Sequence, residues 1–363
     1  MSSRKIVLTG GGTAGHVTAN IAMLPKLKSN GFEVFYIGSY EGIEKRLIEN
    51  EGIPYTGIST GKLRRYLDIK NISDPFRVIK GYAEAKAVLK RISPDIVFSK
   101  GGFVAVPVVW AAHRLHIPVV THESDITPGL ANKLCLNAAA RICCNFPETI
   151  RSLPKNKAVI TGAPIRELLL QGTRDDGLKM TGFSGEKPVL MIIGGSLGSV
   201  AINNAVRQRL DALLQDYDII HICGKNNIDE AFNDRMGYRQ YEYLSDGLRH
   251  LYALADIVIS RAGANVICEL LALEKPNILI PLPKDVSRGD QVLNAASFEK
   301  QGFSMVLDQH QLEADPSLLS NAVSKVYAQR KDFITAMQKA QQISGVEAVY
   351  SVLIQVLSEK EKI

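Results

Sequence analysis

Two glycine-rich segments, each directly after a short apolar run, hold the residues best suited to chemistry. Gly10-Gly11-Gly12-Thr13-Ala14-Gly15 follows Ile6-Val7-Leu8, and Gly194-Gly195-Ser196-Leu197-Gly198 follows an apolar run that ends at Ile193. Glycines permit a tight turn and a close backbone approach, and the free amides at the start of a following helix favour an anion. Each segment alone is a weak signal, because a glycine turn can simply pack a helix onto a strand.

His16 stands directly after the first glycine segment. In a cleft it could act as a general base or as a phosphate contact, because the unperturbed pKa of histidine lies near neutrality. A capping or surface role is the alternative for a lone histidine at a helix start. No His, Cys, Asp or Glu cluster in the sequence has metal-ligand spacing, so we expect neither a structural metal nor an essential metal cofactor.

The surroundings of the first segment argue against a dinucleotide site. Such a site needs an acid at the end of the second strand to hold a ribose hydroxyl. Here the apolar run at 34–37 ends in Gly38-Ser39, and the acids we identify nearby are Glu33 before it and Glu41 beyond it. The chain also lacks the G-x-x-x-x-G-K-[ST] pattern of P-loop nucleotidases.

Strands and helices alternate in both halves, which predicts an α/β fold with parallel sheets and right-handed crossovers. The apolar strands suit burial on both faces of a sheet. Two Rossmann-like domains facing across a cleft would place one glycine loop on each side, as in nucleotide-sugar transferases. In the first half we expect strands at 5–9, 33–37, 95–99, 118–121 and 140–144, and helices at 17–29, 43–50, 76–92, 103–115 and 129–138.

The pattern restarts after a Gly/Pro-bearing hinge at 161–166. We expect domains at 1–163 and 164–343, with residues 344–363 returning as a helix toward the first domain. In the second half we expect strands at 188–193, 218–223, 257–260, 277–281 and 305–307, and helices at 201–214 and 345–360.

Composition bounds the class of protein. The 363 residues have a mean hydropathy of +0.02 and 46% apolar residues, which suits two buried cores. The longest apolar run, at 103–112, is far shorter than the roughly 20 residues that a membrane helix needs. The five cysteines form no C-x-x-C pair, and we expect them to be buried, reduced side chains. They are Cys135, Cys143, Cys144, Cys223 and Cys268.

Charge is unevenly distributed. Residues 1–163 carry 22 Lys and Arg against 12 Asp and Glu, whereas the remainder carries 21 against 25. The first half therefore suits an anionic partner such as lipid headgroups or a pyrophosphate. Lys62-Leu63-Arg64-Arg65-Tyr66 leads into apolar residues at three- and four-residue spacing, which could form a membrane-facing helix surface or an ordinary core face. These residues are Ile69, Ile72, Phe76 and Ile79.

Five ordered motifs together resemble the MurG family of peptidoglycan N-acetylglucosaminyltransferases over essentially the whole chain. The resemblance also covers the hinge at 162–166 and the late segment at 290–295. The motifs are Gly11-Gly12-Thr13-Ala14-Gly15-His16-Val17, His122-Glu123-Ser124-Asp125, Gly129-Leu130-Ala131-Asn132-Lys133, Gly194-Gly195-Ser196-Leu197-Gly198 and Arg261-Ala262-Gly263-Ala264.

The resemblance implies a GT-B fold and inverting transfer of GlcNAc from UDP-GlcNAc to the C4 hydroxyl of undecaprenyl-pyrophosphoryl-MurNAc-pentapeptide. It implies a peripheral enzyme at the cytoplasmic face of the cell membrane, with roles in cell-wall biogenesis, cell shape and division and a cell-wall synthesis complex as a partner. The donor residues it implies are Arg166, Gly195, Ser196, Leu197, Gly198, Glu269, Asp290, Gln291 and Asn294. The acceptor residues are Thr13, Ala14, Gly15, His16 and Asp125, with His16 and Asp125 as the candidate bases.

The chain departs from the family pattern mainly on the acceptor side. Ala14 replaces a usual glycine, Thr18 stands where a proline is usual, and Ser124-Asp125 replaces Gln-Asn. Asp125 either adds a negative charge beside the pyrophosphate or supplies a carboxylate base. Ala262 replaces a usual serine after Arg261.

Three other functions compete with this prediction. A GT-B enzyme acting on another lipid, such as diacylglycerol, fits the acceptor-side departures, and a non-catalytic nucleotide-sugar-binding paralogue is the second alternative. Nucleic-acid binding is disfavoured because no aromatic-interleaved basic patch accompanies the charge.

Overall fold

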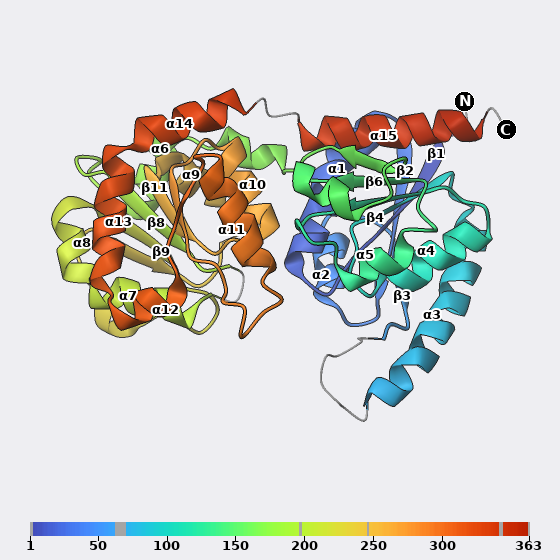
Figure 1. The fold of residues 1–363 in the computed structure, drawn as a ribbon, viewed down its shortest axis with the longest axis horizontal. Coiled ribbons are helices and arrows are strands. Elements are labelled where there is room, and N and C mark those ends of the chain that lie inside the picture. Colours follow the sequence, from blue (N-terminus) through green and yellow to red (C-terminus); the bar gives the residue numbers. More distant parts are fainter. Residues whose placement is uncertain (1–2, 62–69, 196–197, 245–246, 341–343, 362–363) are drawn as a thin grey trace. The chain divides into compact units, whose positions relative to one another are not determined.

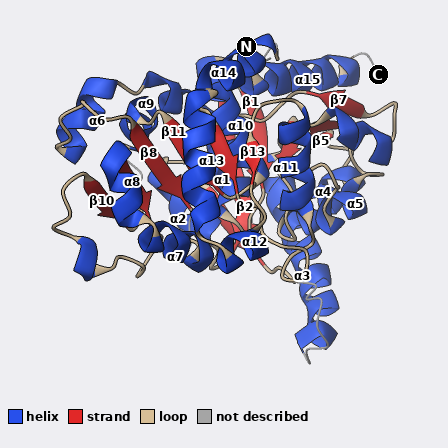
Figure 2. Ribbon diagram, turned by 60° about the vertical axis from the view of Figure 1, so that its left-hand side comes forward, coloured by secondary structure: helices blue, strands red, loops and turns tan. Residues whose placement is uncertain are grey.

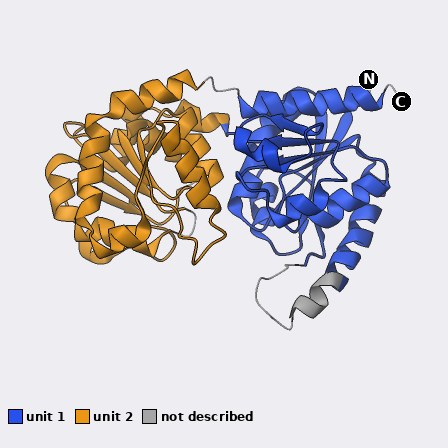
Figure 3. Ribbon diagram, viewed as in Figure 1, with its two compact units in different colours: residues 1–166, 343–363 blue, residues 167–342 orange. Residues whose placement is uncertain are grey.

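The computed structural model describes residues 3–61, 70–195, 198–244, 247–340 and 344–361. The chain divides into two compact units, unit 1 at residues 1–166 with 343–363 and unit 2 at residues 167–342 (Figure 3). Each unit has one parallel sheet with helices on both faces (Figures 1 and 2). The two sheets confirm the α/β prediction with two Rossmann-like domains.

Unit 1 contains a seven-stranded sheet in the order β3-β2-β1-β4-β5-β6-β7. All of its neighbouring strands are parallel, so their carboxyl ends meet at one edge. The strands are β1 Arg4–Thr9, β2 Phe32–Ser39, β3 Tyr55–Ile58, β4 Ile96–Ser99, β5 Val119–Glu123, β6 Arg141–Cys144 and β7 Ala158–Ile160. The helices are α1 Ala14–Ser29, α2 Ile43–Asn50, α3 Lys70–Ile92, α4 Ala105–Arg114, α5 Leu130–Cys135 and α15 Gly345–Lys360, with a 3₁₀ helix at Pro147–Ser152.

Alternate residues of β1 enter two different cores. Ile6 and Leu8 pack with α1 and α15, whereas Val7 packs with α3 and α4 on the other face. This alternation is the two-residue period of a strand that is buried on both sides. Helix α15 comes from the far end of the sequence, yet its residues Val349 and Leu353 belong to the core of unit 1.

Unit 2 contains a six-stranded parallel sheet in the order β10-β9-β8-β11-β12-β13. Helices α7, α8 and α13 share one core with alternate residues of β8 and β11. The strands are β8 Val189–Ile193, β9 Asp218–Ile222, β10 Tyr238–Tyr241, β11 Ile257–Ser260, β12 Asn277–Leu279 and β13 Met305–Val306. The helices are α6 Arg174–Thr181, α7 Val200–Gln208, α8 Leu210–Asp216, α9 Leu248–Leu254, α10 Ala264–Ala272, α11 Asp290–Lys300, α12 Gln309–Ala314, α13 Ser317–Ala328 and α14 Arg330–Lys339, with 3₁₀ helices at Glu167–Gln171 and Glu230–Phe232.

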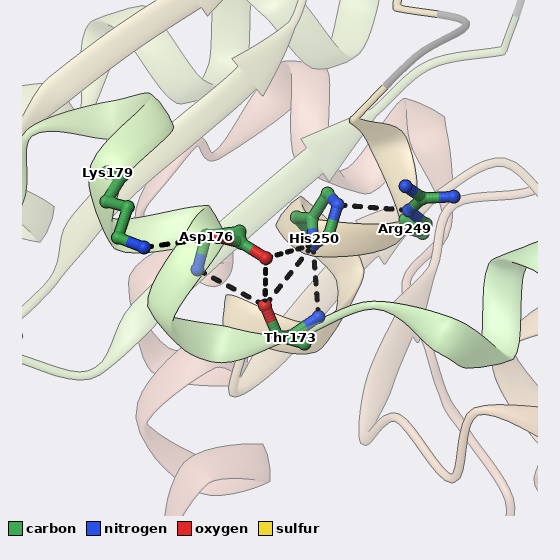
Figure 4. Close-up of polar contacts among 5 residues, drawn as sticks. All are labelled: Thr173, Asp176, Lys179, Arg249 and His250. Atoms are coloured by element: carbon green, nitrogen blue, oxygen red, sulfur yellow. Dashed lines mark hydrogen bonds and ion pairs between the residues drawn. The ribbon is translucent and has the colours of Figure 1, made fainter.

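A polar cluster joins α6 to the start of α9 (Figure 4). Thr173 donates its backbone N–H to His250 Nδ1 at 3.1 Å and its hydroxyl to Asp176 at 2.6 Å. The Asp176 carboxylate lies 3.6 Å from the same ring nitrogen. A Cβ on Gly177 would lie 2.6 Å from the His250 carbonyl oxygen, so the two helices pack at backbone distance.

Several elements differ from the sequence predictions. Three short strands, β3, β7 and β10, were not expected, and the predicted helix at 201–214 is interrupted at Arg209 between α7 and α8. Four cysteines are buried as expected, whereas Cys268 is half-buried. Among the helices that the structure describes, none is long and apolar enough to span a bilayer.

Candidate functional site

The first glycine loop lies at the carboxyl end of β1 and is fixed from below by a buried tyrosine. Tyr36 donates its hydroxyl to the Gly10 carbonyl at 2.6 Å, and Asn20 donates to the Thr9 carbonyl and to the Tyr36 oxygen, both at 3.2 Å. Burial raises the pKa of Tyr36 far above its usual range, so the hydroxyl remains a donor. Gly12 has φ +84°, a conformation that glycine adopts without strain.

Glu44, in the first turn of α2, holds the outer side of the same loop. Its fully buried carboxylate accepts hydrogen bonds from Ser39 N–H at 3.1 Å, from the Ser39 hydroxyl and from Gly12 N–H at 3.4 Å. Glu44 was not among the acids identified near this strand from the sequence, which were Glu33 and Glu41. Glu44 follows the end of β2 by five positions and binds the loop itself, so a carboxylate near this strand end has a structural role here.

The acceptor residues predicted from the first motif lie at the start of α1. Thr13 is the exposed N-cap residue and makes no side-chain capping bond, while Ala14 and Gly15 open the helix. His16 is half-buried in the first turn. Burial is the main cause that lowers the pKa of His122 at the end of β5, and the electrostatic interaction with His16 adds to it. The structure therefore brings His16 and the His122 motif to the same edge of the unit 1 sheet.

A second glycine pair packs against the first loop and was missed at the sequence level. Gly101 and Gly102 follow β4 and have φ +89° and +82°. A Cβ on Gly102 would lie 2.3 Å from the Gly11 carbonyl oxygen, and one on Gly101 would lie 2.9 Å from Asn132. A Gly-Gly pair directly after a predicted strand was the signal that could have revealed it.

The turn that carries Asp125 is organised by its neighbour Glu123. The buried Glu123 carboxylate accepts from Asp125 N–H at 3.0 Å, from Gly129 N–H at 2.9 Å and from Asn132 Nδ2 at 2.8 Å. The Asp125 carbonyl also accepts from the Thr149 hydroxyl at 3.3 Å. Asp125 is half-buried, so its side chain projects from a backbone that is fixed at both the amide and the carbonyl.

The second glycine loop lies between β8 and α7, and Ser196 and Leu197 fall outside the described residues. Gly195 is exposed with φ +97°, and a Cβ there would meet nothing within 4 Å among the described residues. Gly198 has φ +76°, and a Cβ there would lie 1.9 Å from the Cys223 carbonyl oxygen. One glycine therefore faces open space and the other is required by close packing.

Polar contacts hold the base of this second loop. Ser199 caps α7 by accepting from Ile202 N–H at 3.3 Å, and Arg261 donates to the Ser199 hydroxyl at 2.7 Å and to the Ile280 carbonyl at 3.0 Å. Burial lowers the pKa of Arg261. Ser199 and Arg261 also line a cavity of about 480 Å³ beside α7 and α12.

A buried network anchors the next strand behind the loop. Asn203 Nδ2 donates to the Cys223 carbonyl at 3.0 Å, while its Oδ1 lies 3.0 Å from His221 Nε2. His221 Nδ1 lies 2.8 Å from the Tyr238 hydroxyl. Burial lowers the pKa of His221 to about 3, so the ring is neutral and can donate to Asn203 while it accepts from Tyr238.

The remaining predicted donor residues occupy α10, α11 and the end of unit 1. Glu269 is half-buried in α10. Asp290 begins α11 and lies 2.5 Å from Arg288, and Gln291 accepts from Leu282 N–H at 3.0 Å. Asn294 is fully buried and donates to the Ala262 carbonyl at 3.3 Å, which fixes α11 to the loop after β11. The Nε atom of Arg166 is buried with no hydrogen-bond partner among the described residues.

Comparison with known proteins places both halves of the chain in one family. Residues 6–144 match the glycosyltransferase family 28 N-terminal domain, and residues 189–352 match the family 28 C-terminal domain. A protein from Lachnospira eligens is 57% identical over 350 residues, which cover 96% of this chain and 98% of the relative. A protein from Lachnoclostridium phytofermentans is 58% identical over 353 residues, which cover 97% and 99%. Both are named UDP-N-acetylglucosamine--N-acetylmuramyl-(pentapeptide) pyrophosphoryl-undecaprenol N-acetylglucosamine transferase.

Solved structures agree on the fold. The crystal structure of Acinetobacter baumannii MurG aligns with a TM-score of 0.76 at 25% identity, covering 97% of this chain and 99% of that chain. A calicheamicin glycosyltransferase aligns with a TM-score of 0.69 at 13% identity, covering 99% of each chain. The second likeness concerns the fold alone.

Proposed function

Since this chain belongs to glycosyltransferase family 28, we propose that it transfers GlcNAc from UDP-GlcNAc to the C4 hydroxyl of undecaprenyl-pyrophosphoryl-MurNAc-pentapeptide, with inversion. The observation that carries the proposal is 57–58% identity to transferases of that name over nearly the full length of each chain. Such similarity spans both glycine loops and the segments between them, so it covers the donor and the acceptor side alike.

Unit 2 supplies the donor side in this proposal. The proposed roles of the second glycine loop and of the N terminus of α7 are to give the UDP diphosphate backbone hydrogen bonds and a favourable dipole interaction. As the C1–O bond to UDP breaks, these groups stabilise the negative charge on the leaving diphosphate. In unit 2, Glu269, Asp290 and Gln291 are the proposed ribose and sugar contacts, and Arg166, the last residue of unit 1 before unit 2, is a further proposed donor-binding residue.

Unit 1 supplies the acceptor side. The acceptor C4 oxygen attacks C1 of GlcNAc while a base removes its proton, so one C–O bond forms as another breaks. His16 and Asp125 both belong to the edge that carries the first glycine loop, and both are candidates for this base. Their pH–rate profiles separate them, because loss of the true base removes the corresponding ionisation from the profile of kcat.

A comparison of acceptors tests the proposal. The full chain is incubated with labelled UDP-GlcNAc and either the undecaprenyl-pyrophosphoryl muramyl-pentapeptide or diacylglycerol, in the same detergent. Label should move into the muramyl lipid and leave diacylglycerol unlabelled. Preferential labelling of diacylglycerol would replace the proposed acceptor, and no transfer to either lipid would support the non-catalytic alternative. We also propose that no metal is required, so excess EDTA should leave the rate unchanged.

We further propose that unit 1 contacts an anionic membrane surface through α3 and α4. Phe76 and Ile79 on α3 are 73% and 66% exposed, and Arg77 and Lys80 flank them. Trp110 on α4 is 37% exposed. An apolar face with basic neighbours suits a lipid interface, and sedimentation with liposomes should increase with their anionic lipid content. Residues 62–69 and the side chain of Ile72, which the sequence analysis included, lie outside what the structure describes.

A further inference from the structure

A buried lysine occupies the centre of the unit 1 site edge. Lys100 follows β4, which lies between β1 and β5 in the sheet, and its backbone N–H donates to the Thr9 carbonyl at 2.9 Å. Its side chain is 1% exposed. A Cβ on Gly10 would lie 3.2 Å from the Lys100 Cβ, so the stem of the lysine packs directly against the first glycine loop.

The ammonium group of Lys100 reaches the turn after β5. Its Nζ lies 2.6 Å from His122 Nδ1 and donates to the Ser124 hydroxyl at 2.5 Å. His122 Nε2 lies 3.0 Å from the Gly162 carbonyl, which can only accept, so the ring proton is on Nε2 and Nδ1 accepts from Lys100. Burial, reinforced by the Lys100 charge, holds the pKa of His122 well below its usual range. The histidine is therefore neutral, and its electrostatic interaction with Lys100 contributes to keeping it so.

Ser124 is one of the positions at which this chain departs from its family pattern. A serine hydroxyl is short and both donates and accepts, so it can receive the Lys100 N–H and still offer its own proton. The lysine therefore fixes the orientation of the turn that carries Asp125. It also places a full positive charge between that turn and the first glycine loop, where solvent screening is weak.

We propose that Lys100 is an electrostatic and positioning residue for the anionic diphosphate of the acceptor. It acts through the buried interior and through His122 and Ser124, because a side chain that is 1% exposed has almost no surface for direct contact. This inference rests on the proposed function for the identity of the acceptor. The proposed attraction by Lys100, however, applies to any diphosphate bound at the unit 1 loops.

Calorimetric binding of inorganic pyrophosphate to the full chain tests this role. Saturating UDP is present in every titration, so that the donor side is already occupied. Lys100→Met, which removes the charge and keeps the length, should weaken pyrophosphate binding by about 10-fold, the size expected when one attractive charge is lost from a weakly screened site. The affinity for UDP alone should remain within about twofold, since the change lies in unit 1.

Two further variants separate charge from packing. Lys100→Arg keeps the charge and should bind pyrophosphate within about threefold of the wild type. Lys155→Met removes an exposed charge from the same unit and should change binding by less than about twofold, because solvent and salt screen it.

Wild-type pyrophosphate affinity in Lys100→Met would overturn the proposal, and so would an equal loss in Lys155→Met. Should Lys100→Met fail to fold by circular dichroism, Lys100→Arg decides, because a 10-fold loss despite the retained charge contradicts an electrostatic role. Failure of the proposed function would look different. Wild-type enzyme would then transfer no GlcNAc to the muramyl lipid, while pyrophosphate binding would still depend on Lys100.

Discussion

Replacing Gly195 or Gly198 in the second glycine loop by alanine should separate the loop's contact with the donor from its packing. Gly195 and Gly198 both have positive φ, so either substitution introduces a backbone cost of about 1–2 kcal/mol. A Cβ on Gly195 meets nothing within 4 Å among the described residues, whereas one on Gly198 falls 1.9 Å from the Cys223 carbonyl oxygen. The second contact adds an overpacking cost of about 1–3 kcal/mol, so Gly198→Ala should be the less stable variant by that amount.

Gly195→Ala should have the smaller effect on stability of the two variants but a large effect on donor binding. We propose that the UDP diphosphate binds beside Gly195, where a Cβ meets none of the described residues. Gly195→Ala should therefore raise the KM for UDP-GlcNAc by about 10-fold or more, while it perturbs the fold less than Gly198→Ala does. Gly198→Ala should raise the same KM, because the displaced loop no longer presents its amides to the diphosphate.

Thermal unfolding and steady-state kinetics measure the two effects on the same preparations. A further 1–3 kcal/mol of destabilisation should place the Tm of Gly198→Ala roughly 2 °C or more below that of Gly195→Ala. Equal melting temperatures would refute the packing argument. An unchanged donor KM in Gly195→Ala would refute the assignment of this loop to the diphosphate.

The other predictions concern single side chains. His16→Ala should lower turnover by about 100-fold or more while UDP binding by calorimetry stays unchanged, and undiminished turnover would exclude His16 as the base. Burial lowers the pKa of His221 from 6.5 to about 3, so only the unfolded chain gains this proton as the pH falls from 6.5, and stability decreases. In urea unfolding, the free energy of unfolding should fall by about 2 kcal/mol between pH 7 and pH 5 because of this residue. A His221→Gln variant with the same pH dependence would contradict this prediction. Gly177→Ala should destabilise unit 2 by about 1–3 kcal/mol despite its better helix propensity, because the new Cβ meets the His250 carbonyl at 2.6 Å. The exposed Lys179→Ala on the same helix is its control, and an equally stable Gly177→Ala would show that α6 and α9 separate without cost.

Local patterns were sufficient to predict most of the architecture. The runs that became β8 and β11 are nearly free of polar residues, as is the centre of β1 at Ile6-Val7-Leu8, which suits strands buried on both faces, and glycines directly after β1 and β8 marked the turns. The short strands β3 and β10 could not be predicted from apolar runs of this kind. Tyr238–Tyr241 reads Tyr-Arg-Gln-Tyr, with two polar residues between two tyrosines, and lies at a sheet edge, so it has no apolar run to mark it.

The supporting residues of the site were harder to predict, because their roles depend on contacts distant in sequence. Glu44 lies 32 residues from the Gly12 amide that it accepts from, and Lys100 lies 22 residues from His122. A lysine after a strand and a glutamate early in a helix are common on protein surfaces. Only the strand order β2-β1-β4-β5 brings them to the glycine loop and removes them from water.

Asn294 is a predicted donor residue whose position in the structure was not foreseen. The family resemblance implies that it binds the donor, and in the structure it is fully buried and donates a hydrogen bond to the Ala262 carbonyl. Helical spacing therefore does not predict which side chains of α11 point into the protein.

Analysis of the transfer product tests the central claim most directly. The full chain is supplied with the muramyl-pentapeptide lipid and equal concentrations of UDP-GlcNAc and UDP-glucose, and the lipid product is examined by mass spectrometry and NMR. We expect addition of one N-acetylhexosamine at the C4 hydroxyl in the β configuration, with little glucose incorporated. Incorporation of glucose, an α linkage or an unmodified muramyl lipid would contradict it.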